Sequence, residues 1–161
     1  MKILGIDPGT AITGWAVIEA GSGPPKSIAF GSIQPESKNL PERLKTIHRN
    51  LKQLIGLYKP DAISIEELFF ASNAKTAISV GQARGVILLT ASLSGIPVAS
   101  YTPLVVKQTV CGDGKADKKQ VGKMVALTLR LRSVPQPDDT ADALAIALTH
   151  AFRYKMSALT L

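Results

Sequence analysis

Residues 2–19 read KILGIDPGTAITGWAVIE, in which two short apolar runs lie on either side of a Pro-Gly turn. The runs Lys2–Asp7 and Thr13–Glu19 predict two β-strands, and residues 27–34, after a second segment rich in glycine and proline, predict a third. Strands joined by such short connections are usually antiparallel neighbours. We therefore expect an antiparallel meander at the start of the chain.

Downstream of residue 40 the apolar spacing changes from that of a strand to that of a helix. Residues 41–58 predict an amphipathic helix, because leucine and isoleucine recur at helical intervals with basic residues between them. Two further strands are expected at residues 61–66 and 96–101. The remaining helices are expected at residues 73–94, 103–110, 118–132 and 138–152. This order predicts an α/β fold in which a five-stranded mixed sheet carries helices on both faces, as a single domain over residues 1–161.

The composition indicates a globular protein with an excess of basic charge. Apolar residues make up 45% of the chain, and 19 Lys and Arg against 12 Asp and Glu give a net charge of +7. This balance predicts a surface for a polyanion, nucleic acid first and an acidic membrane second. The single cysteine, Cys111, excludes an internal disulfide framework and a cysteine-built zinc site. Because no apolar run is unbroken enough for a signal peptide or a membrane span, we expect a cytoplasmic protein.

Acidic residues stand at the ends of predicted buried strands. Asp7 ends an apolar strand, where a carboxylate costs free energy unless it is paired, hydrogen-bonded or bound to a metal. Hydrogen bonds to the amides of the turn that follows would explain Asp7 equally well. Glu66 and Glu67 end the strand at 61–66, and only one of them can point to a given face of the sheet. An acid of this pair beside Asp7 would form half of a site.

Three further acids, Asp138, Asp139 and Asp142, begin the last predicted helix. If Asp138 is the N-cap, Asp139 and Asp142 lie three residues apart on one helix face. Capping and the helix dipole explain Asp138, but not Asp142, which precedes an apolar run at 143–148. Carboxylates from two strands and one helix suit Mg²⁺ or Mn²⁺. Two such ions can bind the attacking and leaving oxygens of a phosphodiester, so the pattern indicates metal-assisted cleavage of a phosphate backbone.

The basic charge is concentrated between residues 107 and 132. Seven Lys and Arg against two Asp in this segment supply five of the seven net positive charges. A solvated helix face is one explanation, and contacts to DNA phosphates beside the glycine-rich loop at 112–114 are the other. Upstream, Phe69 and Phe70 follow a strand; we expect one to cap the core and the other to stack on an unpaired base.

The helix expected at 73–94 carries a stripe of small and apolar residues. This stripe predicts either close packing on the sheet or a helix–helix contact in a dimer. Its members are Ala74, Ile78, Gly81, Gly85 and Leu88.

Six short motifs occur one after another along residues 1–152. They are GIDPGT at 5–10, IEE at 65–67, NA at 73–74, GQARG at 81–85, VKQTV at 106–110 and DALA at 142–145. In sequence, order and spacing they resemble the bacterial RuvC family of crossover junction endodeoxyribonucleases, which resolve Holliday junctions. The resemblance implies a ribonuclease H-like fold and a homodimer. It further implies symmetric paired nicks in two strands of a four-way DNA junction, with branch-migration proteins RuvA and RuvB as partners and a preference for a TT step.

The resemblance implies a role for each candidate residue. The catalytic acids, which would also bind Mg²⁺ as two ions per subunit with Mn²⁺ as a substitute, are Asp7, Glu66, Asp139 and Asp142. Water would be the nucleophile, and the products would carry ligatable 5′-phosphates. The DNA-binding residues are Phe69, which stacks at the junction point, Lys107 and Lys118, which contact the scissile phosphate, and Lys115 and Lys119. These last two match no motif and are expected to contact the backbone only.

Two other classes of protein compete with this interpretation. Asp7–Thr10 also resembles the first phosphate loop of actin-like ATPases and sugar kinases, but those enzymes need a second phosphate motif and a second domain that we do not find in the sequence. A non-catalytic DNA-architecture protein would explain the charge of +7. It would not explain Asp7 and Asp142, because acids near DNA weaken binding unless a metal neutralises them.

Overall fold

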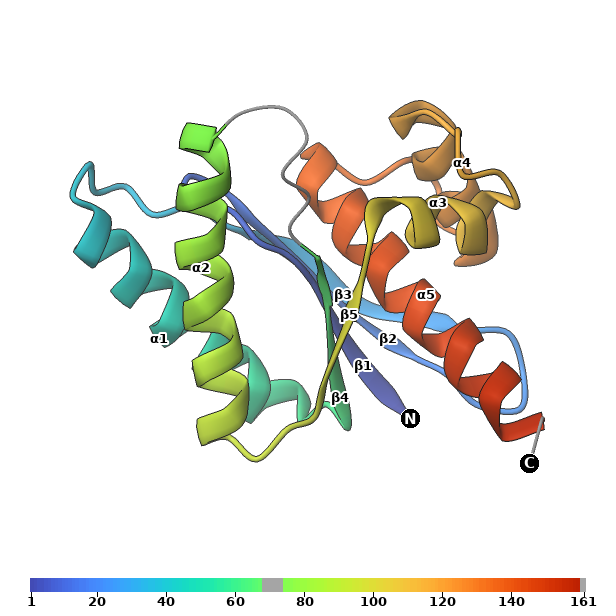
Figure 1. The fold of residues 1–161 in the computed structure, drawn as a ribbon. Helices are drawn as coiled ribbons and strands as arrows, with labels where there is room; N and C mark the ends of the chain where they lie inside the picture. Colours follow the sequence, from blue (N-terminus) through green and yellow to red (C-terminus); the bar gives the residue numbers. More distant parts are fainter. Residues whose placement is uncertain (68–73, 160–161) are drawn as a thin grey trace.

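A five-stranded mixed sheet forms the centre of the computed structural model, which describes residues 1–67 and 74–159 (Figure 1). Strands β1 (Lys2–Asp7), β2 (Thr13–Glu19) and β3 (Lys26–Ile33) form the expected antiparallel meander. Strands β4 (Ala62–Glu66) and β5 (Val98–Tyr101) lie parallel to β1, in the order β3-β2-β1-β4-β5. The predicted mixed sheet is therefore confirmed.

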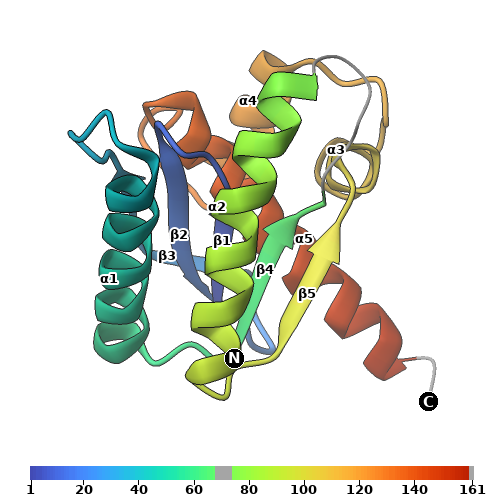
Figure 2. The same ribbon diagram turned by 60° about the vertical axis from the view of Figure 1, so that its left-hand side comes forward.

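Helices cover both faces of this sheet, as predicted. Helices α1 (Leu40–Tyr58) and α2 (Ala74–Leu93) pack on one face, where alternate apolar residues of β1 and β4 meet them. Helix α5 (Asp138–Leu159) crosses the other face, with α3 (Pro103–Cys111) and α4 (Lys118–Thr128) beside it (Figures 1 and 2). Two separate apolar clusters result, one in each layer. No helix within the described ranges is long and apolar enough to cross a membrane.

Helix α5 approaches the first two strands so closely that only glycine fits beneath it. A Cβ atom added at Gly5 would collide with the backbone carbonyl of Ala143, and one at Gly14 would collide with that of Asp139. Glycine in a strand often marks such an approach of another backbone. The contact holds the first turns of α5 against the carboxyl end of β1.

Two helix ends differ from those expected from sequence. Helix α4 ends at Thr128 and not at residue 132, because Arg130 adopts a left-handed conformation with φ of 54° and the Leu131 N–H donates to the Ala126 carbonyl. A left-handed residue commonly ends a helix, but glycine usually supplies it. Helix α5 begins at Asp138, as expected, but continues to Leu159 and does not end at residue 152; Asp138 is its first residue and not the N-cap considered above.

The stripe predicted on α2 does not pack on the sheet. The residues of α2 that are buried against the sheet are Ala83, Ile87 and Ala91. Ile78 is 66% exposed, and a Cβ added at the exposed Gly85 would meet nothing within 4 Å. The packing alternative is therefore wrong for these members, which leave an apolar face of α2 open; the side chain of Ala74 lies outside the described residues.

Candidate active site

Two acidic side chains meet at the carboxyl ends of neighbouring parallel strands. Ile6 of β1 is paired with Ile65 of β4, so Asp7 and Glu66 follow at the same edge of the sheet. Together with Asp142 of α5 they line a pocket of about 330 Å³. Functional groups commonly gather at this edge of an open sheet. The structure thus brings three of the four predicted acids into one pocket.

Lysines from the two short helices complete the polar lining of this pocket. Lys107 of α3 and Lys118 of α4 both line it. The apolar part of the wall is formed by Pro103, Val106, Val121 and Ile146. Two cations facing three carboxylates across an open pocket can hold a phosphate oxygen near an acid-bound ion.

Asp7 is the most strongly perturbed of the acids. The pKa of its carboxyl is raised from 3.8 to about 8, chiefly by burial and then by the negative charges of Glu66, Asp142 and Asp139, with Lys118 acting in the opposite direction. The pKa of Glu66 is raised to about 6, chiefly by burial and then by the charge of Asp142, while Lys118 and Lys107 lower it. Carboxyls that resist ionisation in this way lack a sufficient compensating cation. Such perturbation in a pocket is typical of a functional site.

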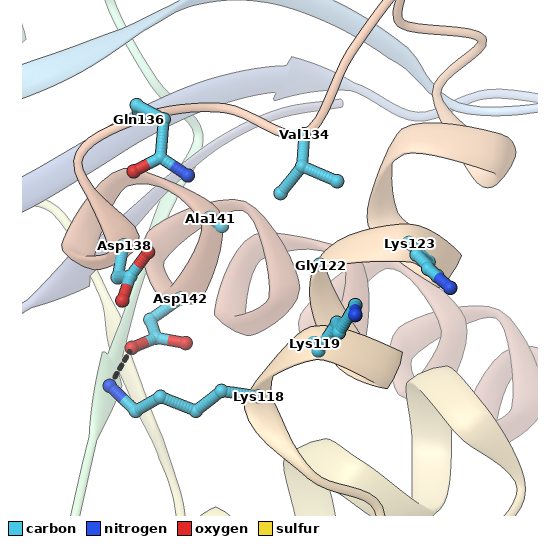
Figure 3. Close-up of a pocket in the computed structure, with 9 residues that line it drawn as sticks. All are labelled: Lys118, Lys119, Gly122, Lys123, Val134, Gln136, Asp138, Ala141 and Asp142. Atoms are coloured by element: carbon cyan, nitrogen blue, oxygen red, sulfur yellow. Dashed lines mark hydrogen bonds and ion pairs between the residues drawn. The ribbon is translucent and has the colours of Figure 1, made fainter.

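Lys118 forms an ion pair with one acid of the pocket. Its Nζ lies 3.0 Å from Oδ2 of Asp142, as the dashed line in Figure 3 shows. This hydrogen bond raises the pKa of Lys118 above its ordinary value. The side chain of Lys118 is nevertheless 72% exposed, against 26% for Asp142. The lysine side chain is therefore largely open to solvent although its ammonium group is paired with Asp142.

Asp139 and Asp138 lie on different sides of the first turn of α5. Asp139 lies against Gly14, whose Cα is paired with that of Asp7, and its charge contributes to the raised pKa of Asp7. Asp138 instead lines a neighbouring cavity with Lys119 (Figure 3). This placement favours Asp139 over Asp138 as the fourth acid, although Asp139 does not itself line the pocket.

The other lysines predicted to contact DNA do not line the pocket of the acids. Lys119 lines the neighbouring cavity on α4, whereas Lys115 is exposed in the loop between α3 and α4, where its backbone N–H donates to Asp113 Oδ1. Phe69 and Phe70 lie outside the described residues. Lys123, which belongs to the predicted basic segment but was not singled out as a DNA contact, lines the same cavity as Lys119. Its four-residue spacing from Lys119 was the signal available in the sequence.

One positioning contact was not predicted. Arg84 of α2 donates from Nε to the backbone carbonyl of Glu66 at 3.3 Å and from Nη2 to Ser100 Oγ at 2.9 Å. It therefore joins the ends of β4 and β5 just where Glu66 leaves the sheet. Nothing in the local sequence around Arg84 indicates these partners, which lie 18 and 16 residues away.

The donor set fits a hard divalent cation. The acidic side chains offer carboxylate oxygens, and burial together with neighbouring acids raises the pKa of Asp7 and Glu66, so their ionised forms lack sufficient compensation from the lysines. Mg²⁺ and Mn²⁺ prefer such oxygen ligands. Within the described ranges, no three His, Cys, Asp or Glu side chains already converge into a finished ion site.

Comparison with known proteins agrees with this chemistry. The family model described as crossover junction endodeoxyribonuclease RuvC matches residues 3–150. A RuvC endonuclease of Syntrophomonas wolfei is 53% identical over 158 residues, which are 98% of this chain and 92% of that protein. A solved structure of Thermus thermophilus RuvC with a Holliday junction substrate is 36% identical, has a TM-score of 0.91, and is covered over 96% of its length by 98% of this chain.

A second solved structure, with low sequence identity, is similar to this chain in fold alone. The yeast mitochondrial Holliday junction resolvase Ydc2 is 12% identical with a TM-score of 0.61, over 99% of this chain and 86% of that one. This likeness, with that to RuvC, confirms the predicted ribonuclease H-like fold. Since the family model spans nearly all of the sheet and its helices and a full-length relative shares more than half of its residues, the chain belongs to the RuvC family of crossover junction endodeoxyribonucleases.

Proposed function

We propose that this protein resolves Holliday junctions by metal-dependent, symmetric nicking of two strands of a four-way DNA junction, leaving ligatable 5′-phosphate ends. The observation that carries the proposal is the single pocket in which Asp7, Glu66 and Asp142 face Lys107 and Lys118. Acids alone would repel DNA, and lysines alone would bind it without cutting. Their combination suits a phosphodiester whose backbone is held and hydrolysed in one place.

Four carboxylates would hold the ions. These are Asp7, Glu66, Asp139 and Asp142. Their four negative charges, when all are ionised, would balance two Mg²⁺ per subunit, or two Mn²⁺ in their place. Ions bound there would lower the pKa of a water molecule and neutralise charge on the reacting phosphate. In the ion-free protein, Asp7 holds a proton at neutral pH because its pKa is about 8. Loading of the site therefore releases a proton from Asp7.

The lysines orient the DNA. Lys107 and Lys118 flank the carboxylates and would bind the non-bridging oxygens of the scissile phosphate. Lys118 leaves Asp142 to do so, which places its ammonium between the acid and the phosphate. Lys115 and Lys119 contact the backbone on either side, and Phe69 stacks on a base at the junction point.

The open face of α2 supports a homodimer. Ile78, Gly85 and Leu89 follow one another at helical spacing, and the two large side chains are 66% and 58% exposed. A two-fold contact between such faces would set two catalytic pockets against the two strands of one junction, which explains paired nicks. Ile78→Glu should yield a monomer in sedimentation equilibrium, with nicks that are no longer paired. Leu57→Glu, at an equally exposed leucine of α1, is the matched control and should stay dimeric.

The resemblance to the RuvC family suggests the partners, the place of action and the preferred cleavage site. We propose that branch-migration proteins RuvA and RuvB bring the junction to this dimer in the bacterial cytoplasm, and that cleavage favours a TT step.

A cleavage assay with three DNA substrates tests the function. Labelled immobile four-way junction, linear duplex and single strand are each incubated with the protein, with and without Mg²⁺, and the nicks are mapped. Paired symmetric nicks confined to the junction with Mg²⁺ are expected, and Asp7→Asn should abolish them while junction binding is retained. Equal cleavage of all three substrates would show a general nuclease and contradict the proposal.

A further inference from the structure

Three cavities that share wall residues lie along α3 and α4, and together they are called the trough. The catalytic pocket shares Lys118 and Asp142 with a second cavity of about 370 Å³ (Figure 3). On its other side it shares Pro103 and Lys107 with a third cavity of about 420 Å³. Each pair of neighbours has two wall residues in common, so the three cavities adjoin one another along the surface.

The second cavity presents positive charge at one end of the trough. Lys119 and Lys123 lie four residues apart on α4 and line it together with Lys118. Four residues of helix correspond to about 6 Å along the helix axis, so the two ammonium groups can reach the same or consecutive phosphates of a strand. Figure 3 shows their side chains on α4, across the cavity from Gln136.

The third cavity presents an apolar surface at the other end. Leu104 is 59% exposed there, beside Pro103 and Gly114. A Cβ added at Gly114 would lie 2.5 Å from Leu104 Cδ1, so glycine is what leaves the leucine room to lie over this loop. A phosphate gains nothing from such a surface, whereas the flat face of a nucleobase removes apolar area from water on contact.

We propose that one DNA strand lies along this trough, with a phosphate on Lys119 and Lys123 at one end and an unpaired nucleobase against Leu104 at the other. The scissile phosphate then lies between them, at Lys107 and Lys118. The inference rests on the proposed function and adds to it a nucleobase subsite and a phosphate subsite on either side of the scissile phosphate. A base in a duplex has its faces covered by its neighbours, so the apolar end selects the exposed bases of a branch point over a linear duplex.

Binding measurements without metal test the two ends separately. A four-way junction carries 2-aminopurine at one nucleotide flanking the cleavage site, and its emission, which rises when the base leaves the helical stack, is followed on titration with protein in EDTA. Affinity is measured over a range of salt concentrations. Leu104→Ala has Leu57→Ala as its matched control, and Lys123→Ala has Lys52→Ala; both controls lie on α1.

Each end has its own expected result. Leu104→Ala should lose at least half of the rise in emission at one flanking position and bind about 5-fold more weakly, with an unchanged salt dependence. Lys123→Ala should keep the emission and lower the slope of log affinity against log salt by about 0.7 to 0.9. If Leu104→Ala matches Leu57→Ala in emission and affinity, or Lys123→Ala keeps the wild-type slope, the proposed path is wrong.

A separate measurement shows whether the proposed nuclease function itself is wrong. Wild-type protein is assayed for nicking of the same junction with Mg²⁺. Absence of nicks with the expected emission and salt slopes would refute resolvase activity and support the trough as a binding site.

Discussion

Replacing Asp7 by asparagine should stabilise the metal-free protein, and increasingly so as pH rises. In the folded state the pKa of Asp7 is raised by burial from 3.8 to about 8. Between these two values the folded protein keeps a proton that the unfolded chain releases, so folding stability falls as pH increases. The stability that the protonated Asp7 carboxyl contributes is fully present below about pH 4 and is lost as pH rises through about 8. Asparagine has no proton to lose, so Asp7→Asn avoids this loss.

The size of the effect follows from the two pKa values. At 1.36 kcal/mol per pKa unit, a pKa raised from 3.8 to about 8 corresponds to about 6 kcal/mol in total. Between pH 5 and pH 7 the pH stays about one unit or more away from both pKa values, so Asp7 is protonated in the folded state and ionised in the unfolded chain. The free energy of unfolding of the wild type should therefore fall by about 3 kcal/mol relative to Asp7→Asn over this range. Above about pH 9 the difference should level off.

Urea unfolding in EDTA at a series of pH values measures this difference. Glu36→Gln, a substitution of an exposed acid, is the matched control and should follow the wild type at every pH. Addition of Mg²⁺ should stabilise the wild type most at high pH and should have little effect on Asp7→Asn, because an ion replaces the missing proton. Parallel stability profiles of wild type and Asp7→Asn between pH 5 and pH 8 would refute the argument that Asp7 is buried without sufficient compensation.

Three further substitutions test the surroundings of the site. Gly14→Ala should lower junction cleavage at least 10-fold, because its Cβ would collide with the Asp139 backbone and push that acid away; Gly21→Ala, with open space around it, should cleave normally in the same gel assay. Ser64→Ala should leave the free energy of urea unfolding unchanged or raise it by up to about 1 kcal/mol, because Ser64 Oγ is buried with no hydrogen-bond partner among the described residues; a clear loss would show a hidden partner. Lys118→Met should tighten Mn²⁺ binding measured by calorimetry at pH 9, because it removes a cation that competes for the acids; weaker binding would contradict this competition.

Much of the architecture is predictable because its signals are local. The alternation and turn residues of 1–34 determine the meander, and the expected limits of β1 and β2 agree with those of the structure. The acids at the ends of β1 and β4 are also local signals, since a carboxylate after a buried apolar strand needs a compensating group wherever it lies. These signals place Asp7, Glu66 and Asp142 as candidates before any contact is known.

Other features depend on which elements meet in space. The sequence around Arg84 does not reveal its hydrogen bonds to Glu66 and Ser100, nor does that of Lys118 reveal its ion pair with Asp142. The end of α4 is unmarked because an arginine takes the left-handed position usually held by glycine. The face of α2 that packs on the sheet could not be chosen from periodicity, since both faces of that helix carry apolar residues.

The sequence by itself predicted the class of fold, the candidate acids and the concentration of basic charge at residues 107–132. These depend on residue type and on spacing along one strand or helix, where geometry is set by the backbone. Only the tertiary structure decided that Asp7, Glu66 and Asp142 line one pocket, that Asp139 and not Asp138 lies beside Asp7, and that this pocket shares wall residues with two neighbouring cavities. These properties arise from the packing of α3, α4 and α5 against the end of the sheet, and such packing depends on residues far apart in the chain.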